Sequence, residues 1–248
     1  MPLAVDGTFR VRDTTYSANR RMRRHIDGVT RLSIVLAGTL RETAARSEVV
    51  AQAGAIVLKD GDAEHATDIG DSGSRVLSIE LPDDTCAGTA HRYRWRQDPS
   101  ALRAGYALWH AVRSGDRRPA QDRLYDCLAL MTDADERPAA PGWLLDVKTR
   151  LEDEGDETIG TAVIAAQLGC HPVYLARAFR RAFGCSISEF RQWQRVRRVL
   201  DGCHGGRDHV RLSDVAQQAG YFDQSHMWRE VRRWTGLAPS AWSISTAP

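Results

Sequence analysis

Several features that would assign the chain to other classes of protein are absent from its 248 residues. No stretch approaches the ~20 consecutive apolar residues that a membrane-spanning helix needs. The N-terminus has no basic region followed by an apolar stretch of signal-peptide length. The five cysteines are scattered without CxxC spacing, which is typical of reduced thiols and not of a disulfide framework. We therefore expect a cytoplasmic protein with no membrane partner.

The motifs of common catalytic sites are also missing. The chain has no Gly-rich phosphate loop, no GxSxG and no HExxH, and its abundant carboxylates form no recognisable acid–base pair. The sequence therefore predicts no catalytic residue, no cofactor and no enzymatic activity.

Charge is unevenly distributed along the chain, although the net charge is only +2. From Gly160 to the C-terminus there are 12 basic and 6 acidic residues, against 22 and 26 before it. A basic C-terminal third on an acidic remainder indicates a polyanionic partner for that third.

The C-terminal third contains the same local pattern twice, in residues 161–184 and again in residues 212–236. In each copy an alanine in an apolar-periodic segment is followed four residues later by a glycine. These pairs are Ala165 with Gly169, and Ala216 with Gly220. The small alanine lets a second helix approach closely, and the glycine fits a turn with positive φ. This is the pattern of a helix-turn-helix, and its repetition argues against chance.

The second segment of each copy has one apolar and one basic face. Leu175 and Phe179 lie four residues apart, as do Met227 and Val231, so each pair shares a helix face that points at the scaffold. The arginines fall mostly on the other side: Arg177, Arg180, Arg181, Arg229, Arg232 and Arg233.

Residues from about Trp143 to Trp242 resemble the DNA-binding domain of the AraC/XylS family of bacterial transcription regulators. The residues that match in order and spacing are Ala165, Gly169, Tyr174 to Phe179, Gly184, Ala216 to Gly220, Gln224 to His226, Arg229 and Gly236 to Trp242. Val231 departs from the family, which usually has Phe near this position. The resemblance implies a transcription regulator that binds double-stranded DNA, works with RNA polymerase and responds to a small-molecule effector.

The resemblance places the second helix of each copy in the major groove. By motif position, the residues that face bases are Val173, Ala176 and Arg177 in the first copy and Gln224, Ser225, Trp228 and Arg229 in the second. Arginine can pair with both acceptors of guanine, and glutamine suits adenine. Trp228 is either a base or sugar contact or a partly buried aromatic. The residues expected to hold phosphates are Arg180, Arg181, Arg195, Arg198, Arg232 and Arg233.

Residues 1 to about 95 have the pattern of short strands separated by turns. The segment 31–36 alternates, with Leu32, Ile34 and Leu36 on one face. Further runs are 9–12, 40–42, 49–50, 55–58 and 76–79, and turn chemistry occurs at 38–39, 59–62 and 70–73. This arrangement predicts an antiparallel sandwich or barrel.

Residues 98–131 are expected to be helical, with Asp98 as N-cap and Pro99 in the first position. Two apolar stripes, in 102–112 and 124–131, pack either on the barrel or on a second subunit, and the resemblance favours a homodimer. The charged, Pro-bearing segment 132–142 is a linker by composition. We predict an α+β fold with a cupin-like sensor domain in 1–131 and an all-α DNA-binding domain with two helix-turn-helix motifs in 143–248.

The N-terminal segment weakly resembles a single cupin-like barrel, the usual N-terminal partner in the AraC family. His25 and His65 fall where metal-binding cupins place ligands. The position that should hold a Glu is Arg31, however, and the usual second His beside His25 is absent. Because two His without a carboxylate make a poor metal site, we expect no metal and assign both to an effector pocket, with a surface or interface role open for His25. A metal-dependent oxygenase is the rival hypothesis, and an interaction module that retains no specific DNA is the third.

Overall fold

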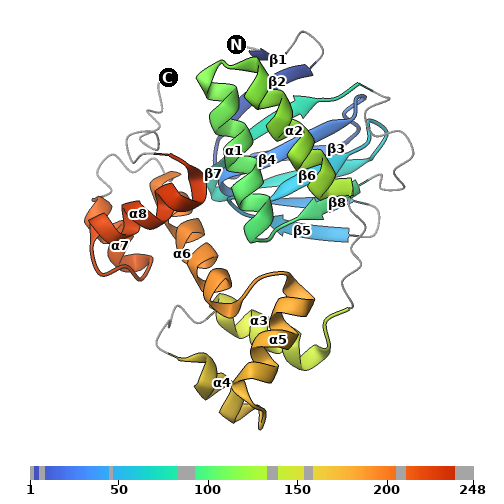
Figure 1. Ribbon diagram of the computed structural model, residues 1–248. Helices are drawn as coiled ribbons and strands as arrows, with labels where there is room; N and C mark the ends of the chain where they lie inside the picture. Colours follow the sequence, from blue (N-terminus) through green and yellow to red (C-terminus); the bar gives the residue numbers. More distant parts are fainter. Residues whose placement is uncertain are drawn as a thin grey trace.

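The N-terminal part of the computed structural model is a curved antiparallel sheet of eight strands, which confirms the predicted β-architecture (Figure 1). Neighbouring strands follow the order β1-β2-β7-β4-β6-β8, with β3 paired to β7 and β5 paired to β4. The structure describes residues 3–5, 9–44, 47–82, 93–132, 139–153, 159–204 and 211–237. The strands are β1 (Leu3–Val5), β2 (Phe9–Tyr16), β3 (Arg21–His25), β4 (Arg31–Ala44), β5 (Ser47–Ala51), β6 (Ile56–Lys59), β7 (His65–Glu80) and β8 (Tyr93–Arg96).

Two of the predicted turns lie inside long strands and are therefore wrong. The segments 38–39 and 70–73 fall within β4 and β7, which pair with each other on both sides of register shifts at Val35/Ala37 and Gly38/Leu40. Gly38 has φ +72° and Gly73 has φ +78°. These glycines bend the two strands while they remain paired, as glycines at bulges do. The turn predicted at 59–62 is confirmed.

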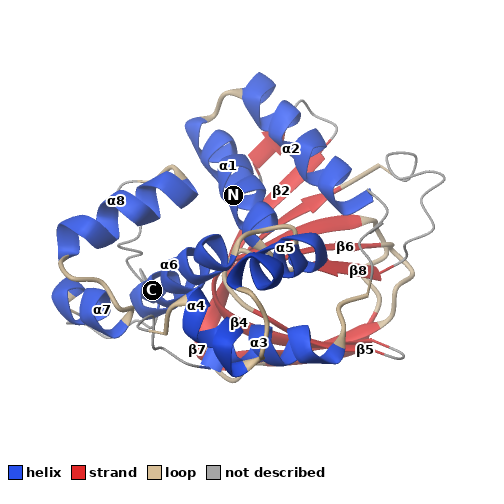
Figure 2. Ribbon diagram, turned by 60° about the horizontal axis from the view of Figure 1, so that its bottom comes forward, coloured by secondary structure: helices blue, strands red, loops and turns tan. Residues whose placement is uncertain are grey.

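Two antiparallel helices cover one side of the sheet (Figure 2). Helix α1 (Pro99–Ser114) begins as predicted, because the Asp98 carboxylate accepts the backbone N–H of Ser100 at 2.8 Å. Helix α2 (Arg117–Thr132) follows after Gly115. The buried faces of α1 and α2 belong to the same hydrophobic core as the strands, so the apolar stripes pack on the barrel. A homodimer through their remaining surface stays a prediction.

The C-terminal half is helical. Its helices are α3 (Gly142–Asp153), α4 (Thr161–Gln167), α5 (Pro172–Phe183), α6 (Ile187–His204), α7 (Leu212–Gln218) and α8 (Gln224–Thr235). Most of the predicted linker and the end of the matched motif, residues 238–242, lie outside the described residues. None of the described helices combines the length and apolar character that crossing a membrane requires.

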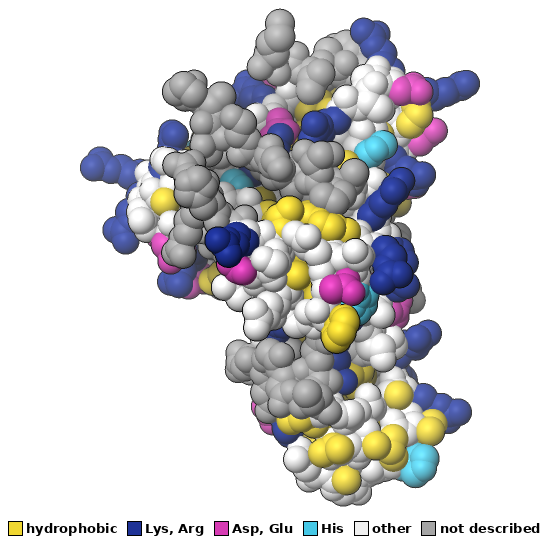
Figure 3. All heavy atoms as spheres, turned by 90° about the vertical axis from the view of Figure 1, so that its left-hand side faces the viewer, with side chains coloured by type: hydrophobic (Ala, Val, Ile, Leu, Met, Phe, Trp, Pro, Cys, Tyr) yellow, Lys and Arg dark blue, Asp and Glu magenta, His cyan; other side chains and the backbone are white. Residues whose placement is uncertain are grey.

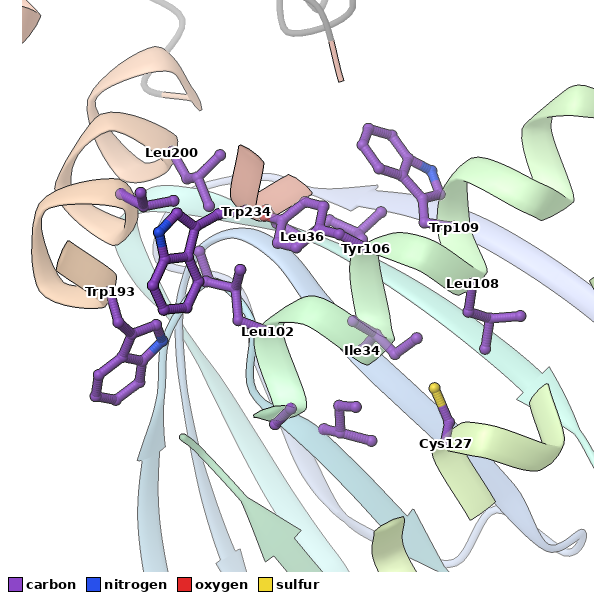
Figure 4. Packing of buried hydrophobic residues seen from close by; sticks show 14 of the residues in the cluster. Ile34, Leu36, Leu102, Tyr106, Leu108, Trp109, Cys127, Trp193, Leu200 and Trp234 are labelled. Atoms are coloured by element: carbon purple, nitrogen blue, oxygen red, sulfur yellow. The ribbon is translucent and has the colours of Figure 1, made fainter. Parts of the chain in front are cut away.

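One continuous core joins the barrel to the helical half (Figure 4). Trp193 and Leu200 of α6 and Trp234 of α8 lie near Leu102 of α1. The Arg103 guanidinium of α1 stacks on the Trp234 ring at 4.0 Å. Two segments that the sequence presents as separate domains are therefore packed against each other.

Asp201, near the end of α6, binds the barrel where β4 bends. Its carboxyl accepts the backbone N–H of Gly38, and burial raises its pKa to about 7 although Arg197 and this hydrogen bond both lower it. In an unfolded chain an aspartate loses its proton near pH ~3.9. The folded protein therefore binds one more proton than the unfolded chain between these values, and this group's contribution to stability falls as pH rises from about 4 to about 7.

We expect Asp201→Asn to remove this pH dependence, because the amide oxygen can accept the Gly38 N–H without a charge to desolvate. The melting temperature of the variant should match that of the wild type at about pH 4 and exceed it by several degrees at pH 8. Scanning calorimetry across this range measures the difference. A difference that stays constant with pH would show that folding does not raise the pKa of Asp201.

Candidate functional site

The first helix-turn-helix unit consists of α4, α5 and the turn between them. Gly169 in this turn has φ +65°, and Ala165 on α4 is fully buried, as the sequence predicts. Leu175 and Phe179 of α5 are also fully buried. The Phe179 ring packs edge-on against Phe190 of α6 at 5.6 Å. The apolar face of α5 thus points at the scaffold and leaves the arginine-bearing face outside.

The second unit, α7 and α8, repeats this construction. Gly220 in its turn has φ +82°, and Ala216 is buried. Met227 and Val231 of α8 are fully buried. The Asp223 carboxylate caps α8 by accepting a backbone N–H at 2.6 Å. Both predicted motifs are therefore present, with the expected residues in their cores.

Helix α6 holds the two units together. It begins at a capping box, in which the Glu189 N–H donates to Ser186 Oγ at 3.1 Å and the Ser186 N–H donates to a Glu189 carboxylate oxygen at 3.0 Å. Its 18 residues are about 27 Å long at ~1.5 Å per residue. It contacts α5 of the first unit and both helices of the second. Helices α5 and α8, the second helices of the two units, therefore both pack against the single helix α6.

A cluster of five polar side chains, the interior cluster, lies inside the barrel and comprises His25, Asp27, Glu42, Lys59 and His65. The Lys59 ammonium lies 3.0 Å from His65 Nε2, 3.3 Å from the Glu42 carboxylate and 3.6 Å from the Asp27 carboxylate. Ligand atoms of His25, Asp27 and His65 lie within 4.8 Å of one another. All five side chains line a cavity of about 70 Å³.

The expectation that no carboxylate accompanies the two histidines is wrong. Asp27 follows His25 by two residues, and Glu42 comes from near the end of β4. The sequence motif pointed to position 31, but Arg31 instead donates to Asp27 at 2.8 Å. The effector-pocket assignment of the two histidines remains a prediction: both line the cavity, with His65 buried and His25 partly exposed.

A family model described as a helix-turn-helix domain matches residues 164–243, which include the second unit and all of the first except the first three residues of α4. The C-terminal region is an AraC-type helix-turn-helix domain. No curated protein sequence matches the chain.

Three solved structures illustrate what the chain resembles. Wild-type ToxT from Vibrio cholerae strain SCE256, bound to an unsaturated fatty acid, is 12% identical over 95% of this chain and 95% of that chain, with a TM-score of 0.39. ToxT from Vibrio cholerae O395 bound to (E)-4-(8-methylnaphthalen-1-yl)but-3-enoic acid is 11% identical over 96% and 98%, with a TM-score of 0.41. A cupin-2 domain containing protein from Shewanella frigidimarina NCIMB 400 is 17% identical over 33% of this chain and 78% of that chain, with a TM-score of 0.29.

Most of the residues predicted to face bases lie on the outer surface of the AraC-type domain. Val173 at the start of α5 is 50% exposed, and Trp228 on α8 is partly buried and packs against the core. The other members of the set are exposed: Ala176, Arg177, Gln224, Ser225 and Arg229. For Trp228 the structure shows the packing contact, and a base contact remains a prediction.

The arginines predicted to hold phosphates differ more widely in their surroundings. Arg180, Arg181, Arg232 and Arg233 of the AraC-type domain are exposed, and Arg198 is half-buried. Arg195 has only 15% of its side chain exposed, binds Glu230 at 3.3 Å and stacks on the Tyr221 ring at 5.2 Å. Its guanidinium therefore connects α6 to the second unit, and a phosphate contact by Arg195 stays a prediction.

Two exposed aromatic residues of the AraC-type domain were missing from the predicted site. Phe222, just before α8, is 94% exposed, and Tyr174, the second exposed residue of α5, is 59% exposed. Tyr174 stacks on Trp143 of α3 at 6.1 Å. Apolar side chains are also visible over α4 and α5 in the lower part of the space-filling view (Figure 3). The signal available in the sequence was an aromatic residue within two positions of the first residue of each second helix.

Proposed function

We propose that the chain is a transcription regulator that reads two adjacent major-groove segments with α5 and α8. The observation that supports this most directly is the pair of second helices, both mounted on α6 with their arginine faces exposed. DNA binding itself follows from the AraC-type domain. The reading of two segments by one chain is the proposal.

The two units differ in what they offer to bases. In the first unit, exposed Val173 and Ala176 suit contacts to thymine methyl groups, and Arg177 suits guanine. In the second unit, Gln224 suits adenine and Arg229 suits guanine. Two different sets of side chains imply two different boxes in the DNA.

We further propose that a small-molecule effector controls the DNA-binding half. A cavity of about 200 Å³ lies where the end of β8 and the start of α1 meet α3, α5 and α6. Trp95 lines both this cavity and the cavity inside the barrel. A ligand in either cavity can therefore contact Trp95, which lies between the barrel and the helical half. The Arg103–Trp234 stack then connects α1 directly to α8.

As a transcription regulator, the protein would act with RNA polymerase and would be located with the DNA in the cytoplasm. It would have no catalytic role. The interior cluster has the donor types of a metal-dependent enzyme, which is the alternative function for the barrel.

Replacing Arg229 and Arg233 by alanine is expected to weaken DNA binding in two different ways. Arg229→Ala should cost about 1–3 kcal/mol and relax the preference at one base pair, because a guanine contact is lost. Arg233→Ala should weaken binding to all sequences alike and lower the salt slope by about one unit, because a phosphate contact is lost. Titrations against a set of single-base variants of the bound site, at several salt concentrations, separate the two effects.

The control is Arg123→Ala, since Arg123 lies on α2 and pairs with Asp126 at 2.9 Å. It removes the same charge at a distance from the proposed interface and should leave affinity unchanged. If Arg229→Ala and Arg233→Ala both weaken binding without altering base preference, the division into base and phosphate contacts is incorrect.

A further inference from the structure

Lys59, the last residue of β6, is one of only two lysines among the chain's 34 basic residues. Its side chain is 7% exposed and points into the barrel, where it meets the interior cluster. Elsewhere the chain uses arginine almost without exception. A buried ammonium is a compact point charge that a planar guanidinium cannot replace sterically, so lysine at this position indicates a specific requirement.

The two histidines are oriented as metal ligands are. His25 Nδ1 lies 2.7 Å from the Arg23 carbonyl oxygen, and His65 Nδ1 lies 2.9 Å from the Ala63 carbonyl oxygen. A carbonyl oxygen only accepts, so Nδ1 carries the proton in both rings. Nε2 is then the ring nitrogen that can offer a lone pair to an electron-pair acceptor. Metal-bound histidines are fixed in the same way by a partner on the other ring nitrogen.

The carboxylates complete the donor set. One Asp27 oxygen is buried without a hydrogen-bond partner and faces Lys59 at 3.6 Å and His65 Nε2 at 3.8 Å. Glu42 is held by Thr67 at 3.3 Å and by the Tyr93 hydroxyl at 2.9 Å. Imidazole and carboxylate together are a donor set for Zn²⁺, Fe²⁺, Co²⁺ and Ni²⁺.

The distances, however, fit an ammonium and not a metal ion. The donors lie 3.0–3.6 Å from Lys59 Nζ, which is hydrogen-bond and ion-pair range. Zinc binds nitrogen and oxygen at about 2.0–2.2 Å. A divalent ion among these donors would also lie against the Lys59 charge. The residues present therefore do not fit a metal ion while Lys59 is in place.

We propose that the Lys59 ammonium occupies the metal position of this barrel, and that it excludes a divalent ion from a donor set that is otherwise competent to bind one. Removing the amino group leaves His25, Asp27 and His65, whose ligand atoms lie within 4.8 Å of one another, as a site for a transition-metal ion, with Glu42 as a further carboxylate that Lys59 no longer neutralises. Exclusion of metal by Lys59 does not depend on how the chain binds DNA. A barrel that binds no metal cannot act as a metal-dependent enzyme, so the same test distinguishes an effector-binding barrel from an enzymatic one.

The test uses the full chain as wild type and as Lys59→Ala, each dialysed with Co²⁺ and then against metal-free buffer. We expect the wild type to retain no Co²⁺, and the variant to retain about one ion per chain with visible Co²⁺ absorption. The variant should also melt at a lower temperature without metal, because two carboxylates lose their cation. Co²⁺ should restore that loss, while the melting temperature of the wild type should not respond.

Two controls locate the ion. Lys148→Ala removes the other lysine, which lies on α3 and pairs with Glu152 at 2.7 Å, and it should behave like the wild type. The double variant Lys59→Ala/His65→Ala should lose the Co²⁺ that the single variant gains. Lys59→Leu keeps more of the packing volume, so it replaces Lys59→Ala if that variant does not fold in either buffer.

Stoichiometric Co²⁺ on the wild type would overturn the proposal, since the ammonium would then not exclude metal. A folded Lys59→Ala or Lys59→Leu chain that binds no Co²⁺ would overturn it as well. The same holds if neither variant folds with or without Co²⁺, because the remaining side chains would then not form a competent site.

Discussion

Replacing Gly38 with alanine is expected to lower the melting temperature of the chain by roughly 5–15 °C. A Cβ at this position would lie 2.1 Å from the Gly73 carbonyl oxygen and 2.9 Å from the His204 ring. The first of these neighbours is backbone in a paired strand and cannot rotate away. The φ of +72° adds a strain of about 1–2 kcal/mol, and overpacking adds about 1–3 kcal/mol or more. The substitution therefore disturbs the bend in β4 and β7. It also disturbs the packing of α6 against that bend.

Gly115 provides the matched control. It has φ +74°, but a Cβ there would meet nothing within 4 Å. Gly115→Ala therefore introduces the backbone strain without a steric clash. It should lower the stability only by the strain of about 1–2 kcal/mol. Thermal melts of both variants give the comparison. Equal losses for the two would show that close packing at the bend contributes nothing beyond conformational strain.

The helix-turn-helix units were predictable because their information is local. Ala165 and Gly169 lie within one helix and its turn, and the burial of Phe179 follows from its spacing to Leu175 along the same helix. Helical period, capping and glycine in a turn depend on residues only a few positions apart. The repetition of the pattern at Ala216 and Gly220 then distinguished it from an ordinary helical pair.

The barrel was predictable as an architecture but not in its pairing. Gly38 and Gly73 have the residue chemistry of turns, and only the pairing of β4 with β7 shows that they face each other in bent strands. Sequence separation hides such pairings, because no local period encodes which strands become neighbours. The same difficulty concealed the packing of α6 on the barrel, which depends on His204 reaching Gly38.

The interior cluster shows the same limit for site chemistry. His25 and His65 were identified from motif positions, whereas Asp27, Glu42 and Lys59 were not. Glu42 and Lys59 lie on the neighbouring strands β4 and β6, and they meet only when the sheet curves. Arg195 is a comparable case in the helical half, because its charge suggested a phosphate contact, and only the structure shows that it pairs with Glu230.

Inserting half a helical turn (about five base pairs) between the two boxes of a bound site is expected to abolish tight binding. Helix α6 fixes the separation and orientation of α5 and α8, so one protomer meets two groove segments on one side of the duplex. These recur every ~10–10.5 base pairs. The insertion moves one box to the opposite face. Because each lost base-pair contact costs about 1–3 kcal/mol, affinity should fall about 100- to 1000-fold.

The measurement that tests the central claim is therefore the affinity of the full chain for three DNAs of otherwise identical sequence. These are the selected site, the site with the half-turn insertion, and the site with one box scrambled at unchanged length. Two reading helices held by α6 predict tight binding to the first DNA and equally weak binding to the other two. Undiminished affinity for the DNA with the insertion would contradict the account, because only one of α5 and α8 would then read the DNA.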